Sequence, residues 1–131
     1  MRTIPVGTKG TFEIVVGADD LASTMNSALP AVMATRVMVG MMELAAMAAM
    51  RDFMDPGETS VGVSIEVQHM AATPPGHRVR AEAEVTRSEG RRLEFAVRAF
   101  DETEEIGSGT HRRVVIDLAK FKERLKSKIK G

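Results

Sequence analysis

The sequence predicts an α+β domain in which a curled, five-stranded antiparallel sheet wraps around one long helix. Two observations predict this fold. The first half of the chain holds a nearly continuous apolar stretch of helix-forming residues. The second half alternates apolar with charged residues between short turns. With 131 residues, the chain suits a single domain, 1–131, that can bury a proper core.

The first half predicts one strand and the long helix. Strand-forming residues gather in Thr11–Val16 between two glycines, and a polar, irregular segment follows over 18–27. Ala, Met, Leu and Val fill most of 36–53, which predicts a helix about 27 Å long. Because this helix is apolar on nearly every face, we expect it to be buried. The Asp-Pro-Gly sequence at 55–57 ends it.

The second half predicts four strands joined by short turns, followed by a helix. In most of these strands, apolar residues take every second position and charged residues take the positions between them. Short turns make neighbouring strands antiparallel. The predicted strands are 61–70, 77–87, 92–101 and 106–116, and the terminal helix spans about 117–130 with Asp117 as its N-cap.

An antiparallel sheet with one charged face must cover its other face. The helix at 36–53 is the one large apolar object that the sequence offers, so we expect the sheet to curl around it, which is the hot-dog fold. A single sheet would still leave one apolar flank of the helix open. Because a second copy of the chain would cover that flank, the sequence predicts a homodimer or a higher homo-oligomer.

Composition narrows the function. The formal net charge is zero, which argues against a nucleic-acid partner. The chain has no cysteine and its three histidines lack metal-ligand spacing, so we expect neither a disulfide nor a metal site. The N-terminus lacks the apolar core of a signal peptide, and the apolar run 37–50 is too short to span a bilayer. We therefore expect a cytoplasmic protein without a membrane partner.

The basic residues are concentrated at the C-terminal end. Residues 120–131 carry six basic side chains and one acidic side chain, so this tail has a charge of +5 and the remainder −5. A solvated helix face is the simpler interpretation of this tail. The alternative is attraction for an anionic ligand such as a nucleotide phosphate.

Glu43 is the best single pointer to function. It is the only polar residue in the apolar run 37–50. Burying an unpaired carboxylate costs several kcal/mol, so such a group is protonated, paired or used in chemistry. In the structural interpretation, Glu43 pairs with a buried arginine or with backbone donors, or it points to an exposed stripe of the helix. In the functional interpretation, it faces a cleft and acts as a general base or a nucleophile.

Thr35 and two histidines are further candidates. Thr35 could cap the long helix, or its hydroxyl could orient a carbonyl, a water or another side chain. On an ideal helix it lies roughly 80° around from Glu43. His69 ends a predicted strand and is either structural or a proton shuttle. The glycines around His111 indicate a bulge or a close backbone approach rather than a phosphate loop.

Five short blocks resemble the hot-dog thioesterases of the fluoroacetyl-CoA thioesterase family. The resemblance covers roughly residues 29–125, and its most specific block reads His-x-Ala-Ala-Thr-Pro-x-Gly. The order and spacing of Thr, Glu and His also match the family. The blocks are Ala34–Glu43, Ser60–Gly62, His69–Gly76, Glu89–Leu93 and Ile106–Arg113.

The resemblance implies an enzyme that hydrolyses a small acyl-CoA thioester with a catalytic set of Thr35, Glu43 and His69. It also implies that the backbone N–H near Gly62 binds the thioester oxygen at a dimer interface. The family implies no cofactor beyond the CoA that is part of the substrate.

Two residues depart from the family pattern beside the proposed catalytic positions. Arg36 stands where the family has a small or apolar residue, and Met70 stands where we expect Thr. We place both among the substrate-binding residues. Two other functions remain open. In a non-catalytic acyl- or CoA-binding module, Arg36 could pair with Glu43. An enoyl-CoA hydratase or dehydratase fits less well, because its Asp and His signature is absent.

Overall fold

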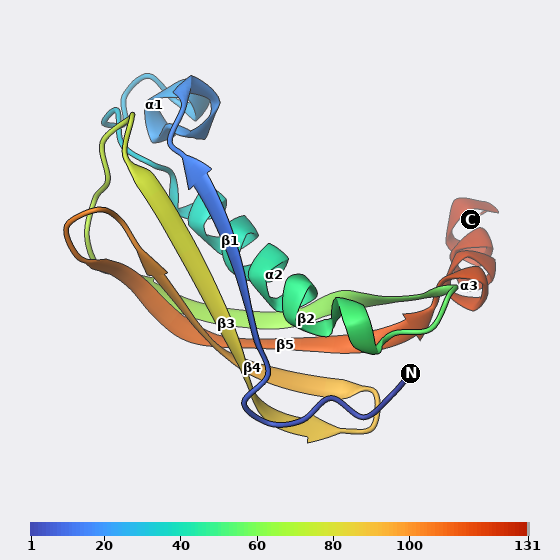
Figure 1. Ribbon diagram of the computed structural model, residues 1–131. Coiled ribbons are helices and arrows are strands. Elements are labelled where there is room, and N and C mark those ends of the chain that lie inside the picture. Colours follow the sequence, from blue (N-terminus) through green and yellow to red (C-terminus); the bar gives the residue numbers. More distant parts are fainter. Residues whose placement is uncertain (131) are drawn as a thin grey trace.

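A curled antiparallel sheet wraps around one long helix in the computed structural model, which describes residues 1–130 (Figure 1). The strand order is β1-β3-β4-β5-β2, and every neighbouring pair is antiparallel. The predicted fold class is therefore confirmed. The strands are β1 (Lys9–Val15), β2 (Glu58–His69), β3 (Arg78–Glu89), β4 (Arg92–Phe100) and β5 (Glu105–Asp117), and the helices are α1 (Ala22–Met25), α2 (Thr35–Met50) and α3 (Leu118–Lys130).

The centre of the sheet follows the alternation of the sequence. In β3 and β4 the apolar residues of the pattern face α2, and the charged residues between them face away. Ala81 pairs with Ala99 and Ala83 with Val97 in the register of these strands, and all four side chains are buried. Small side chains at the centre of the sheet let the helix backbone come close to it.

Helix α2 is buried on the side that faces the sheet but not all round. Met38, Met42, Ala45 and other residues of that side are essentially inaccessible. On the opposite flank, Leu44 is 41% exposed and Met47 is 37% exposed. This flank is the one that the sequence analysis expected a single sheet to leave open.

The element boundaries differ in small ways from the predicted ones. Helix α2 begins at Thr35 and ends at Met50, and a 3-10 turn, Arg51–Phe53, continues it. The segment 18–27, predicted as irregular, contains a 3-10 turn and the short helix α1. The predicted cap of α3 is confirmed, because the backbone N–H of Lys120 donates to Asp117 Oδ1 at 3.0 Å.

Strand β2 forms one edge of the sheet and carries an irregularity in its middle. It pairs with β5 along one side only. The register shifts between Gly62 and Ser64, where an extra residue bulges. Helix α3 projects from the end of the sheet beyond this edge (Figure 1). Among the described residues, no helix has both the length and the apolarity to cross a membrane.

Gly10 lets α2 lie directly on β1. A Cβ atom at this position would overlap the carbonyl oxygen of Ala45 and the backbone nitrogen of Ala49. We expect Gly10→Ala to lower the free energy of unfolding by about 1–3 kcal/mol, because the helix must move away from the strand. Urea denaturation measures this change. The control is Gly17→Ala, whose Cβ would meet only Asp20 at 3.7 Å, and its stability should equal that of the wild type. Equal stability of the two variants would contradict the packing account.

Candidate active site

Thr35 and His69 form a hydrogen-bonded pair at the start of α2 and the end of β2. The N-cap of α2 is Ala34, so the Thr35 side chain does not cap the helix. Its Oγ1 lies 2.8 Å from His69 Nδ1. The pair lines a hollow of about 300 Å³ together with Met33, Met70 and neighbouring residues. A hydroxyl this close to an imidazole can pass its proton to the ring.

The surroundings of His69 favour the neutral imidazole. Burial lowers the pKa of His69, and the backbone of Ala71 offsets part of this effect. A neutral ring with an unprotonated Nδ1 accepts a hydrogen bond from the Thr35 hydroxyl. The other ring nitrogen, Nε2, is buried and has no hydrogen-bond partner among the described residues. His69 is thus arranged as a base for Thr35.

Glu43 lies in a second hollow, of about 380 Å³, which it lines with Gly62, Ser64 and His111. Its side chain is 40% exposed, and its Oε2 lies 3.4 Å from Arg113 Nη1. A Cβ atom at Gly62 would lie 3.6 Å from the same oxygen. The carboxylate is therefore paired with an arginine, as in the structural interpretation of the sequence, yet it still faces an open hollow beside the glycine.

Arg113 is held by four hydrogen bonds although its side chain is only 4% exposed. Nε donates to Ser60 Oγ at 2.8 Å, and Nη2 donates to the Ser60 carbonyl at 3.0 Å. Nη1 donates to Glu43 Oε2 and, at 3.2 Å, to His111 Nε2. A buried guanidinium needs such partners, because each unsatisfied donor would carry the full cost of desolvation.

His111 completes this network as a neutral ring. Its Nδ1 donates to the Ser64 carbonyl at 2.8 Å, which leaves Nε2 free to accept from Arg113. Burial lowers the pKa of His111, the Ser64 backbone bond opposes this, and the nearby Arg113 charge lowers the pKa further. His111 therefore serves as an acceptor that fixes the arginine.

The chain brings together some predicted site residues but not all of them. Thr35, His69 and Met70 share the first hollow, whereas Glu43 and Gly62 share the second. Arg36 lines neither hollow. Its Nη2 donates to the Asp19 carbonyl at 3.4 Å, and Glu43 has its ion pair with Arg113 instead. The ion pair between Arg36 and Glu43 that the non-catalytic alternative would use is therefore not formed.

The sequence analysis missed Ser60 and Arg113 and gave His111 no partner. One signal could have found two of them. In β5, His111, Arg113 and Val115 alternate with residues that face away from the helix, so all three lie on the core face. An arginine at such an inward position requires a buried acceptor, and Glu43 was the one carboxylate in the apolar run 37–50.

Comparisons with known proteins point to one family. A family model described as fluoroacetyl-CoA-specific thioesterase matches residues 16–119. The fluoroacetyl-CoA thioesterase of Streptantibioticus cattleyicolor is 52% identical over 99 residues, which are 76% of this chain and 71% of that protein.

Solved structures agree with this match. A solved structure of a fluoroacetyl-CoA thioesterase has a TM-score of 0.89 at 43% identity, and the match covers 95% of this chain and 96% of that chain. A mutant of that enzyme in complex with acetyl-CoA has a TM-score of 0.90 at 42% identity, with coverages of 95% and 98%. A thioesterase superfamily member from Thermus thermophilus has a TM-score of 0.90 at 34% identity and covers 99% of this chain and 98% of its own.

The Arg113 network predicts a strong effect of Ser60 on stability. We expect Ser60→Ala to reduce the free energy of unfolding by about 1–3 kcal/mol, because the buried Nε of Arg113 loses its acceptor. The matched control is Ser64→Ala, since Ser64 accepts from His111 only through its backbone carbonyl. Urea denaturation should show a change within about 0.5 kcal/mol for this control. Equal effects of the two substitutions would contradict the role of Ser60.

Proposed function

This chain belongs to the fluoroacetyl-CoA-specific thioesterase family, and we propose that it hydrolyses the thioester of a short acyl-CoA with Thr35, His69 and Glu43. The observation that carries the proposal is the 2.8 Å hydrogen bond between Thr35 Oγ1 and His69 Nδ1. A nucleophile within hydrogen-bond distance of its base is the arrangement that acyl transfer requires.

The dimensions of the site support a short acyl group. The two hollows that hold the site residues have volumes of about 300 and 380 Å³, at the small end of the range for ligand pockets. Met33 and Met70 line the hollow of Thr35, and further methionines of α2 lie in the core. Their flexible side chains adapt to small apolar groups. A mutant of a related thioesterase was solved in complex with acetyl-CoA, whose acyl group is short.

In the first step, Thr35 Oγ1 attacks the thioester carbonyl carbon while His69 Nδ1 takes the hydroxyl proton. The carbon–sulfur bond then breaks, and the CoA thiolate receives that proton from His69. The products of this step are CoA and an acyl ester on Thr35. This role for Thr35 differs from the one that the sequence suggested, in which its hydroxyl orients another group.

In the second step, Glu43 accepts a proton from a water molecule whose oxygen attacks the acyl carbon. The bond between that carbon and Thr35 Oγ1 then breaks, and Oγ1 takes the proton back from Glu43. This releases the carboxylic acid and restores both Thr35 and Glu43. The bond from Arg113 orients the carboxylate toward the hollow. A backbone N–H near Gly62 would stabilise the negative oxygen that develops in both steps, because the bulge after Gly62 interrupts the pairing of β2.

The two hollows must meet for this reaction, and a homodimer would achieve that. Strand β2 has one open edge, and the exposed residues Leu44 and Met47 lie on the flank of α2 that the sheet leaves open. Antiparallel pairing of β2 with its copy about a two-fold axis beside Ile65 or Glu66 places His69 within one position of the partner's Gly62. Each site would then take Thr35 and His69 from one subunit and Glu43 from the other.

Thiol release from a panel of acyl-CoA substrates tests this function directly. The chain has no cysteine, so a thiol reagent gives no protein background. We expect Glu43→Gln to release about one thiol per site and then to stall, with a steady rate at least about 100-fold below that of the wild type. The control is Glu13→Gln on β1, which removes an exposed carboxylate far from both hollows in the sheet order.

Three outcomes would contradict the proposal. If Glu43→Gln released thiol at the same steady rate as the wild type, the Glu43 carboxylate would take no part in the reaction. Binding of CoA esters without thiol release would indicate the non-catalytic module, and addition of water to crotonyl-CoA would indicate a hydratase. We propose no cofactor for the reaction other than the CoA of the substrate.

The pKa of His69 predicts the pH dependence of hydrolysis. His69 must be unprotonated to accept the Thr35 proton, so kcat/KM should fall as the pH decreases through its pKa. Burial lowers this pKa, so the fall should occur below the ordinary histidine value of 6.5, with a plateau at neutral pH. The control His77→Asn should keep the same acidic limb. A rate that increases on acidification would contradict the role of His69 as a base.

A further inference from the structure

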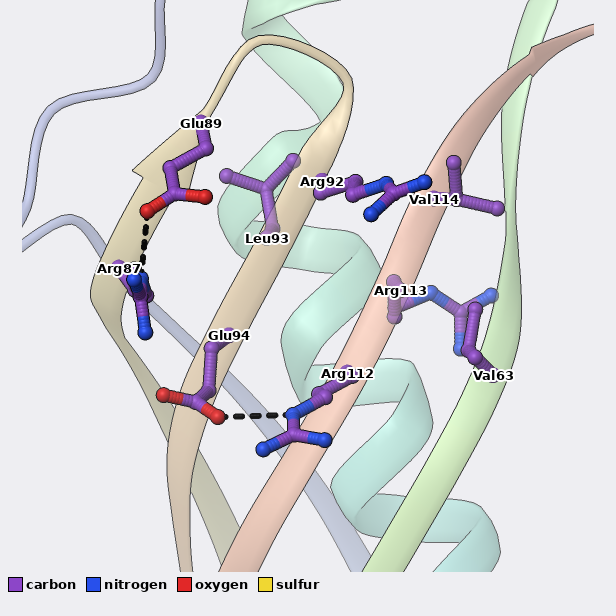
Figure 2. A pocket seen from close by; sticks show the side chains of 9 residues that line it. All are labelled: Val63, Arg87, Glu89, Arg92, Leu93, Glu94, Arg112, Arg113 and Val114. Carbon is purple, nitrogen blue, oxygen red and sulfur yellow. Dashed lines mark hydrogen bonds and ion pairs between the residues drawn. The ribbon is translucent and has the colours of Figure 1, made fainter.

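A third hollow, of about 600 Å³, lies on the outer face of the sheet, where the β3–β4 hairpin, β5 and β2 come together (Figure 2). It is larger than either hollow that holds the site residues. Arg87, Arg92 and Arg112 surround it on three different strands. The chemistry of the proposed reaction uses none of these side chains.

The charge of this hollow is positive although the chain around it is acidic. Residues 1–119 carry 12 basic and 17 acidic side chains, a net charge of −5. The residues that line the hollow, by contrast, include four arginines and two glutamates. Two of the arginines are paired, since Arg87 bonds Glu89 at 2.6 Å and Arg112 bonds Glu94 at 2.8 Å. Arg92 has no carboxylate partner among the described residues, and its guanidinium lies inside the hollow (Figure 2). The local excess of arginine therefore attracts anions.

The hollow also has apolar surface between its charges. Val63 and Val114 line it, and Val63 is 64% exposed. A flat base packs on such aliphatic side chains and on arginine planes, while phosphate groups accept paired hydrogen bonds from guanidinium groups. Both parts of a phosphorylated adenosine thus find matching surfaces in one place.

The outer hollow adjoins the hollow of Glu43. Val63, in the bulge of β2, lines both of them. Arg113 lines the outer hollow and reaches Glu43 at 3.4 Å on the inner side. A CoA thioester joins its reacting carbonyl to a phosphorylated adenosine through a long, flexible arm, so the two ends of one substrate could occupy adjacent hollows.

We propose that the outer hollow binds the 3′-phosphorylated adenosine diphosphate end of the CoA substrate, with Arg92 as its principal phosphate ligand. This inference rests on the proposed function, because it assigns the second end of the same substrate. Arg112 assists as a second cation, and Val63 and Val114 contact the base.

A pair of substrates separates this subsite from the chemistry. The same short acyl group is offered as its CoA ester and as its N-acetylcysteamine ester, which lacks the nucleotide. We expect Arg92→Gln to raise KM for the CoA ester about ten-fold while kcat and the kinetics of the short ester stay unchanged. The matched control is Arg98→Gln, which removes an arginine from the outer face of the same strand but outside the hollow.

Binding of adenosine 3′,5′-bisphosphate tests the subsite independently of turnover. Calorimetry should show binding to the wild type and to Arg98→Gln, with an affinity about ten-fold lower for Arg92→Gln and lower for all three at high salt. Absence of binding to the wild type would overturn the proposal, as would an equal KM change for both esters or no change for either. A protein that binds the bisphosphate through Arg92 but releases no thiol would refute the proposed function and leave the subsite standing.

Discussion

The buried guanidinium of Arg113 is the constraint on which the rest of the site depends. A charge at this depth is stable only if its donors are satisfied, and Ser60, His111 and Glu43 satisfy them. These partners come from β2, β5 and α2, so one side chain fixes the position of the long helix against the open edge of the sheet. Glu43, the polar residue in the apolar run of α2, therefore stabilises the buried arginine and also faces an open hollow.

The position of this network also bears on the proposed homodimer. Arg113 holds Glu43 at the middle of α2, whereas the bond between Thr35 and His69 lies at the beginning of the helix. The two groups line separate hollows. Residues of the edge strand β2 and of α2 line both hollows. In the proposed dimer, one pairing event would therefore cover apolar surface and complete two sites.

Much of this arrangement could be predicted from the sequence, because regular elements carry periodic patterns. The alternation in β3 and the apolar run of α2 are sufficient for the sheet, the helix and the open flank. Glu43 stood out for the same reason, as the exception in a pattern. The catalytic roles of Thr35 and His69 were predicted mainly from the resemblance to a family, and less from the residues themselves.

Other features have no local pattern from which to predict them. Thr35 and His69 are 34 positions apart, and their contact depends on how β2 crosses the start of α2. The bulge beside Gly62 shifts the register without a distinctive sequence. The bond from Arg113 to Glu43 spans 70 positions, so it exists only once the sheet has curled. Periodic patterns predict the elements themselves, but they do not predict which side chains of distant elements come into contact.

Complementation between two inactive variants tests most directly whether the site is assembled from two subunits. Thr35→Ala and Glu43→Gln are each purified, mixed, unfolded and refolded together, and steady thiol release is measured. If each site takes Thr35 from one subunit and Glu43 from the other, half of the dimers are mixed and each has one intact site. The mixture should then recover about a quarter of the wild-type activity. A mixture no more active than its separate components would contradict a site shared between subunits.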